Sequence, residues 1–184
     1  MAQAFEHEQL TGEVIQVGTI VSVDHAARSC TVEIGDLVTG ALPWFALFAG
    51  RVRLWLPPAV GEQCAVLCPE GDLANGLVLP GLYCDAHPAP AADPDLVHLA
   101  MPDGAVISYD HAAHALAVTL PAGGTAAITA PGGVTIEGDV AIRGNLSIEG
   151  TAEATQDVIG AGKSLKAHKH TGVAAGSAQS GPPA

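Results

Sequence analysis

The 184-residue sequence contains few aromatic and few basic side chains. Aromatic residues make up 4% of the chain, which excludes a core built mainly from large rings. Only seven lysines and arginines stand against 19 aspartates and glutamates, so the formal net charge is −12. Because nucleic-acid binding needs clustered Lys and Arg to neutralise phosphates, we expect no nucleic-acid partner.

A long apolar run is also missing. The longest uncharged hydrophobic stretch, residues 37–50, is interrupted by Gly40 and Pro43. It is shorter than the roughly 20 residues that a membrane-spanning helix needs. The first basic residue is Arg28, whereas a secretory signal begins with a basic segment. We therefore expect no signal peptide and no transmembrane helix, and assembly in the cytoplasm.

The sequence contains four cysteines, all in its first half: Cys30, Cys64, Cys68 and Cys84. The spacing of Cys64 and Cys68 is not that of a zinc-binding C-x-x-C pair. If both lie on one strand, alternation places them on the same face. We expect reduced, buried thiols rather than a disulfide framework.

Small aliphatic residues, glycine and proline are abundant. Hydrophobic residues make up 48% of the chain, and 22 glycines and 13 prolines punctuate them. This composition predicts an all-β fold of many short strands. After a polar arm over 1–13, the strand-like runs of residues 14–84 favour a small closed barrel. The predicted strands are 14–17, 19–23, 30–34, 52–56, 63–68 and 76–79.

Residues 85–95 contain three prolines and four alanines without periodicity, which predicts a semi-rigid linker between two parts of the chain. From Leu96 onward, short alternating segments are separated by turn signals. These signals lie at residues 102–104, 110–114, 121–124 and 131–133.

A six-residue repeat follows. Residues 134–139, 140–145 and 146–151 each carry aliphatic side chains at positions one and three and glycine at position five. The two aliphatic residues lie on one face of a short strand, and glycine permits a sharp turn at positive φ. One such strand cannot bury its aliphatic face alone. Three units make at most about one coil within one chain, so we expect three chains to wind together around a shared axis.

Near the C-terminus, His168 and His170 form an H-x-H pair. In an extended segment both imidazoles project to one side, so one chain offers two nitrogen ligands. A threefold axis would gather six imidazoles, which favours an octahedral ion such as iron over four-coordinate zinc. The alternative is an exposed basic tail with two incidental histidines. Three lysines and no acidic residue follow Asp157.

Nothing in the sequence indicates catalysis. No nucleophile with a nearby base, no convergent carboxylate pair and no phosphate-binding glycine loop is evident, so we expect no enzymatic activity. His111 and His114 bracket a turn and are expected to be surface residues. The larger aromatic residues are expected in the barrel core or at a subunit interface: Trp44, Phe45, Phe48 and Trp55.

Several segments together resemble the phage baseplate assembly protein V family, the central spikes of contractile tails, including R-type pyocins. They are Gly18–Asp24, Gly35–Gly40 with Leu42-Pro-Trp, Gly61–Asp72 and Gly76–Tyr83. The block Gly61-Glu-Gln through Gly71-Asp72 is fairly specific and is shared more distantly with type VI secretion spikes.

This resemblance implies an N-terminal OB-fold barrel, then a trimeric intertwined β-helix shaft with a small metal-bound apex. It implies one iron ion per trimer on the threefold axis, held by His168 and His170 of each chain. The expected partners are two further copies, baseplate hub or tail tube proteins and the target bacterial outer membrane, which the spike pierces when the sheath contracts. The expected segments are 1–13 arm, 14–84 OB fold, 85–95 linker, 96–160 β-helix and 161–184 iron-binding tip.

Two alternatives remain open from the residues. A hexapeptide-repeat acyltransferase is also trimeric, but it needs many more hexads and a catalytic histidine among them. A simple OB-fold binding module with a flexible tail needs only the barrel.

Overall fold

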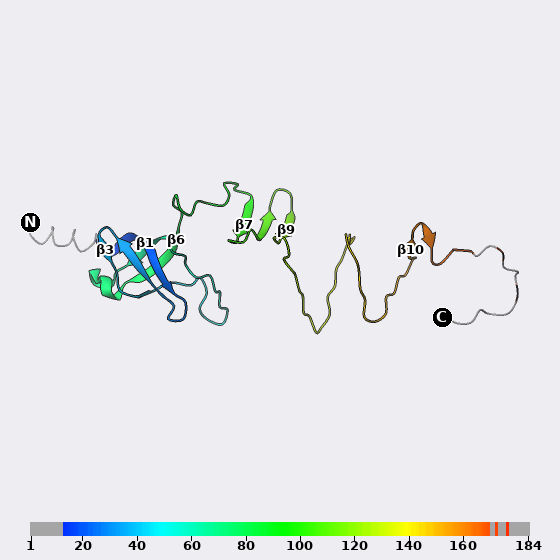
Figure 1. Cartoon of the computed structure of the whole chain (residues 1–184), viewed down its shortest axis with the longest axis horizontal. Coiled ribbons are helices and arrows are strands. Elements are labelled where there is room, and N and C mark those ends of the chain that lie inside the picture. The colour runs from blue at the N-terminus through cyan, green and yellow to red at the C-terminus, as the bar shows by residue number, and fades with distance from the viewer. Residues whose placement is uncertain (1–12, 170–171, 173–175, 177–184) are drawn as a thin grey trace, which may run out of the picture. The chain divides into compact units, whose positions relative to one another are not determined.

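The computed structural model describes residues 13–169, Gly172 and Gly176. Its elements are short β-strands and two 3-10 turns, which confirms the all-β prediction (Figure 1). The chain divides into two compact units, the first ending at Ala127 and the second beginning at Ile128. Across the described residues, none of the helical segments has the length and apolar character needed to cross a membrane.

A small barrel forms the first part of the chain. Its main sheet has the strand order β3-β2-β1-β5-β6, with β4 pairing β2. The other end of the β4 segment reaches β6, because Trp44 bridges Val78 and the Phe45 N–H donates to the Val78 carbonyl at 2.8 Å. These two contacts close the sheet into a barrel. The strands are β1 Ile15–Asp24, β2 Ser29–Ile34, β3 Leu37–Val38, β4 Leu42–Pro43, β5 Gln63–Leu67 and β6 Leu77–Leu82.

The barrel core is built from small side chains that alternate along the strands. Its buried members are Ile20, Cys30, Val32, Leu42, Cys64, Val66, Cys68 and Val78. Burial raises the pKa of the Cys64 thiol to about 11 and also raises those of Cys30 and Cys68. The prediction of buried, reduced thiols is therefore confirmed for these three, while Cys84 is half-buried and also unpaired.

A close backbone approach and a buried side-chain hydroxyl complete the packing of the barrel. A Cβ at Gly18 would lie 2.5 Å from Val32 Cγ1 and 2.6 Å from the Glu33 carbonyl oxygen. The buried Thr39 hydroxyl accepts a hydrogen bond from the Val32 N–H at 3.0 Å and donates one to the Gly40 carbonyl at 2.8 Å. The Thr39 hydroxyl thus provides the hydrogen-bond acceptor that the Val32 N–H of β2 needs at a point where the pairing of strands is interrupted.

Two details of the strand prediction are wrong. Residues 14–17 and 19–23 are not separate strands, since β1 runs through Gly18 and bends instead at a bulge between Ile20 and Ser22. Residues 52–56 form no strand but a loop with one isolated bridge, Ala49 to Arg53. Pro57 and Pro58 follow at once and cannot donate to a ladder, which limits pairing there.

The aromatic residues of this loop lie at its surface. Phe45, Phe48 and Trp55 are exposed, and Trp44 alone of the four packs partly against the core. Their predicted place in the barrel core is therefore wrong for these three. The alternative, a subunit interface, stays a prediction.

After coil at residues 85–95, a three-stranded antiparallel sheet follows (Figure 1). Its strands are β7 Leu96–Ala100, β8 Val106–Asp110 and β9 Ala115–Thr119. Turns lie at residues 102–104 and 111–114, where the sequence predicted them. No strand is assigned between Leu120 and Val158, so the β-helix shaft and the segment boundaries stay predictions.

Gly18→Ala is expected to destabilise the barrel by about 1–3 kcal/mol, because the added methyl overpacks Val32 and a backbone carbonyl. Urea unfolding of the full chain measures this change. Gly40→Ala is the matched control, since its Cβ would meet nothing within 4 Å. Equal stability of the two variants would contradict the close approach at Gly18.

Candidate metal site and apolar shaft surfaces

A small hairpin precedes the H-x-H pair. It pairs β10, Ile159–Gly160, with β11, Lys163–Ser164. The two residues between these strands, Ala161 and Gly162, have φ of 47° and 75°. Positive φ at both central positions gives a tight turn whose twist matches that of the strands. The turn therefore fixes where the chain reverses before His168.

Asp157 holds the base of this hairpin. Its Oδ1 accepts from the Val158 N–H at 2.8 Å and from the Lys166 N–H at 3.1 Å. Hydrogen bonds from the Ser164 side chain and then from the Lys166 backbone lower the pKa of the Asp157 carboxyl. Sequence reasoning missed this residue, although its position as the last acidic residue before the lysines was a visible signal.

The same hairpin positions His168. The His168 N–H donates to the Ser164 carbonyl at 3.1 Å. The ring Nδ1 lies 3.1 Å from that carbonyl and 3.0 Å from the Leu165 carbonyl. Carbonyl oxygens only accept, so Nδ1 carries a proton and is the donor in these contacts. This is the tautomer in which an imidazole binds a metal through Nε2, with its other nitrogen held by backbone.

The second predicted ligand, His170, lies outside the described residues. Within the part of the chain that the structure describes, no three His, Cys, Asp or Glu side chains gather as a metal-binding group. One chain thus supplies too few ligands for a tight site from its described residues. The tautomer of His168 suits a metal ligand, and the metal site itself stays a prediction.

The three-stranded sheet has one apolar face. The register pairs Val97 with Tyr109 and Leu99 with Ile107, and pairs these β8 residues with Leu116 and Val118. Since paired residues share a face, six large apolar side chains lie together, each 39–72% exposed. The other face is mixed, with Ser108 and Ala117 at its centre and the half-buried Leu96 and Val106 toward its ends. A sheet with one exposed apolar face needs a covering partner.

The hexads also expose large apolar side chains. Their aliphatic side chains are 52–69% exposed in the single chain: Val134, Ile136, Val140, Ile142, Leu146 and Ile148. The glycines at position five, Gly138, Gly144 and Gly150, have φ of 130°, 155° and 139°. The chain bends at each of them. The predicted glycine turns are therefore confirmed, and the described residues leave the apolar side chains of the hexads more than half exposed.

His111 and His114 lie in the β8–β9 turn and are exposed, as predicted. The His111 ring packs near Tyr109, with ring centroids 5.4 Å apart. Neither is brought to His168 by the described contacts.

Comparison with known proteins matches both ends of the chain. Residues 16–83 match the family described as the type VI secretion system/phage-baseplate injector OB domain. Residues 164–184, which include His168 and His170, match the GpV apex motif. The barrel described above is thus an OB domain, as the resemblance implied.

A relative matches about two thirds of the chain. The spike protein of Escherichia phage P2 is 42% identical over 122 residues, which are 66% of this chain. The matched stretch is 57% of the P2 protein, so the chain spans less than two thirds of that relative.

Asp157 gives a pH-dependent test of the hairpin. Its lowered pKa means that its carboxylate stabilises the hairpin above the ordinary Asp value of about 3.9. That contribution is lost as the pH falls through the lowered pKa. We expect the Lys166 amide NMR shift to titrate below pH 3.9 and to lose this step in Asp157→Asn. Glu153→Gln is the control, and a Lys166 titration unchanged in Asp157→Asn would contradict the assignment.

Proposed function

Because the chain belongs to the phage-baseplate spike family, whose OB domain and apex motif it carries, we propose that it is a non-enzymatic, homotrimeric spike at the tip of a contractile tail. The particle is a phage tail or an R-type pyocin. The OB domain attaches to baseplate hub or tail tube proteins. Residues 96–160 form the shaft, and residues 161–184 form the tip.

The exposed aliphatic side chains of the hexads carry this proposal. A fully buried Val, Leu or Ile contributes about 1.5–3 kcal/mol, and each chain offers six that are more than half exposed. Winding three chains around one axis turns all six inward and supplies the strand partners that the single chain lacks. The apolar face of β7–β8–β9 adds a second surface of the same kind just before the hexads.

A shaft of this kind suits mechanical work. Continuous backbone pairing around a dry aliphatic axis resists buckling without large rings, in keeping with an aromatic content of 4%. The proposed activity of the spike is mechanical and involves no chemical step. Contraction of the sheath drives the spike into the target outer membrane.

At the tip, the proposal places one iron ion on the threefold axis. His168 and His170 of each chain would bring six imidazole nitrogens, a donor set that suits an octahedral ion. Bound metal would crosslink three chain ends that have little core of their own. What this chain contributes is the hairpin, which sets the tautomer of His168 through the Ser164 and Leu165 carbonyls.

Replacing one axial side chain tests the shaft. Ile142→Asp would place three carboxylates inside the trimer, which costs several kcal/mol without partners. We expect native mass spectrometry and sedimentation at micromolar concentration to show loss of the trimer. Ala141→Asp, the neighbouring residue on the opposite face, is expected to leave it intact. A trimer that tolerates Ile142→Asp as well as Ala141→Asp would contradict the axial packing.

Metal content tests the tip. The purified trimer is expected to hold about one iron per three chains by elemental analysis, and His168→Ala is expected to lose it while remaining trimeric. His111→Ala, in the β8–β9 turn, is the control and should retain the metal. A well-folded trimer without metal would overturn the iron site and leave the shaft proposal standing.

A further inference from the structure

Arg143 is the single basic residue in a long acidic part of the chain. Between Arg53 and Lys163 the sequence contains no other lysine or arginine. Arg143 occupies position four of the second hexad, and Glu137 and Glu149 occupy position four of the first and third. The three hexads therefore carry charges of alternating sign at one repeated position.

Position four lies on the outer side of each hexad. Successive side chains of an extended segment point to opposite faces, so the aliphatic residues at positions one and three leave positions two and four on the other face. Glu137, Arg143 and Glu149 are all exposed in the single chain. Charged side chains at this position can thus meet the charges of a neighbouring strand without entering the aliphatic axis.

We propose that position four of the hexads forms columns of alternating charge between chains, in which Arg143 of one chain lies between Glu137 and Glu149 of its two neighbours. This inference rests on the trimer proposed above. The chain bends at the glycine of each hexad, so successive hexads of one chain lie on successive faces of a threefold shaft. The place beside a hexad on its own face is then filled by the next hexad of another chain.

The spacing within a column follows from the pairing of strands. Neighbouring strands lie about 4.8 Å apart, and the aliphatic residues face the axis only when position four lies beside position four. Each column then contains Glu137, Arg143 and Glu149 from three different chains. Opposite charges on adjacent strands stabilise their pairing, and like charges destabilise it.

These columns select the register of the three chains. Positions one, three and five carry the same kind of residue in every hexad, so the aliphatic core is nearly unchanged if one chain slips by six residues. Such a slip makes equivalent hexads neighbours, which places Arg143 beside Arg143 and Glu137 beside Glu137. Repulsion between these like charges disfavours a pairing that the aliphatic core alone permits.

Zero-length crosslinking tests the column. The hexads contain no lysine, so Arg143→Lys introduces one side-chain amine, which a carbodiimide joins to a carboxylate in contact with it. In full-length trimers assembled from ¹⁴N and ¹⁵N chains, we expect peptides that join position 143 to Glu137 or Glu149 and carry both isotopes. An intact trimer that gives only single-isotope peptides, or no such peptide, would overturn the column.

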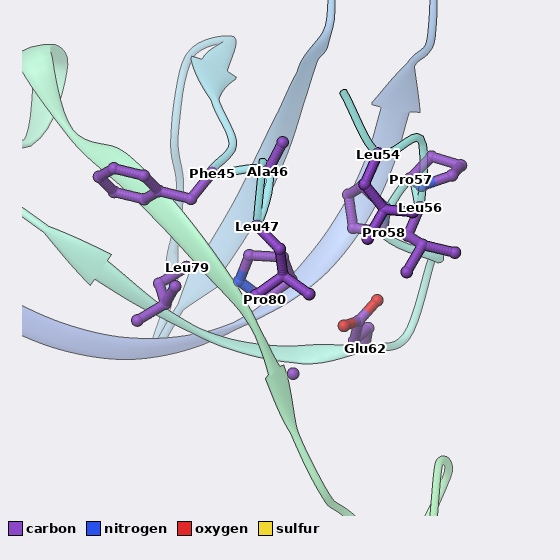
Figure 2. Close-up of a pocket in the computed structure, with 11 residues that line it drawn as sticks. Phe45, Ala46, Leu47, Leu54, Leu56, Pro57, Pro58, Glu62, Leu79 and Pro80 are labelled. Atoms are coloured by element: carbon purple, nitrogen blue, oxygen red, sulfur yellow. The ribbon is translucent and has the colours of Figure 1, made fainter. Parts of the chain in front are cut away.

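A groove of the OB domain supplies the matched control for this experiment. Leu56 and Glu62 line the groove within one chain (Figure 2). Leu56→Lys is expected to join Glu62 of the same chain, so its crosslinked peptide carries a single isotope. Native mass spectrometry of each sample reports the trimer. A monomeric wild-type chain refutes the trimer proposed above and the column with it.

Charge reversal tests the alternation. Arg143→Glu makes every column uniformly negative, and we expect the trimer to dissociate at a lower urea concentration. This loss is expected to be largest at about 0.01 M salt and to shrink at about 1 M, because salt screens exposed charges. Arg51→Glu, in the OB domain, changes the net charge equally and is expected to leave dissociation unchanged.

Reversing the whole column is the decisive variant. Combining Glu137→Arg, Arg143→Glu and Glu149→Arg restores alternation with every sign exchanged, and we expect the wild-type urea midpoint to return. A triple variant that dissociates as early as Arg143→Glu would overturn the column. An Arg51→Glu chain that loses the trimer as readily as Arg143→Glu would overturn it too, because net charge would then explain the loss.

Discussion

A short strand with one apolar face cannot cover that face by itself, and most of this chain after the OB domain obeys this constraint. β7, β8 and β9 make one sheet with a face of exposed large apolar side chains, and the hexads form no sheet in the described part of the chain. In the proposed trimer, folding of this part is tied to association, because the free energy of burying the aliphatic side chains becomes available between chains. The monomer and the proposed trimer would differ in stability for that reason.

The OB domain differs from this part of the chain because it buries its apolar side chains by itself. Its barrel closes on itself through the Trp44–Val78 bridge and buries eight small core residues within one chain. Close approach at Gly18 and the Thr39 hydrogen bonds complete packing that larger side chains provide in other barrels. The chain therefore joins a barrel that buries its core within one chain to a segment whose large apolar side chains are exposed, with a proline-rich linker between them.

Prediction from the sequence was most accurate where the periodicity of the side chains matches the geometry of the backbone. Residues 30–34 and 63–68 alternate cleanly and became β2 and β5, and the position-five glycines took up positive φ. Residues 52–56 alternate too, but a strand forms only where a partner strand runs beside it. The prolines that follow cannot donate backbone hydrogen bonds to such a partner. The Asp157 hairpin escaped prediction because a turn through Ala161 and Gly162 carries no strong turn signature. His170 lies outside the described residues, so the ligand pair rests on sequence and family.

The bends at Gly138, Gly144 and Gly150 recur after identical intervals, and this makes the length of the segment modular. Removing or adding six residues would preserve the face on which every aliphatic side chain lies, whereas a change of one residue would turn the following side chains to the opposite face. Natural variation in this part of the chain should therefore proceed in whole hexads. The proposed shaft could be lengthened or shortened in this way without redesigning the OB domain or the tip.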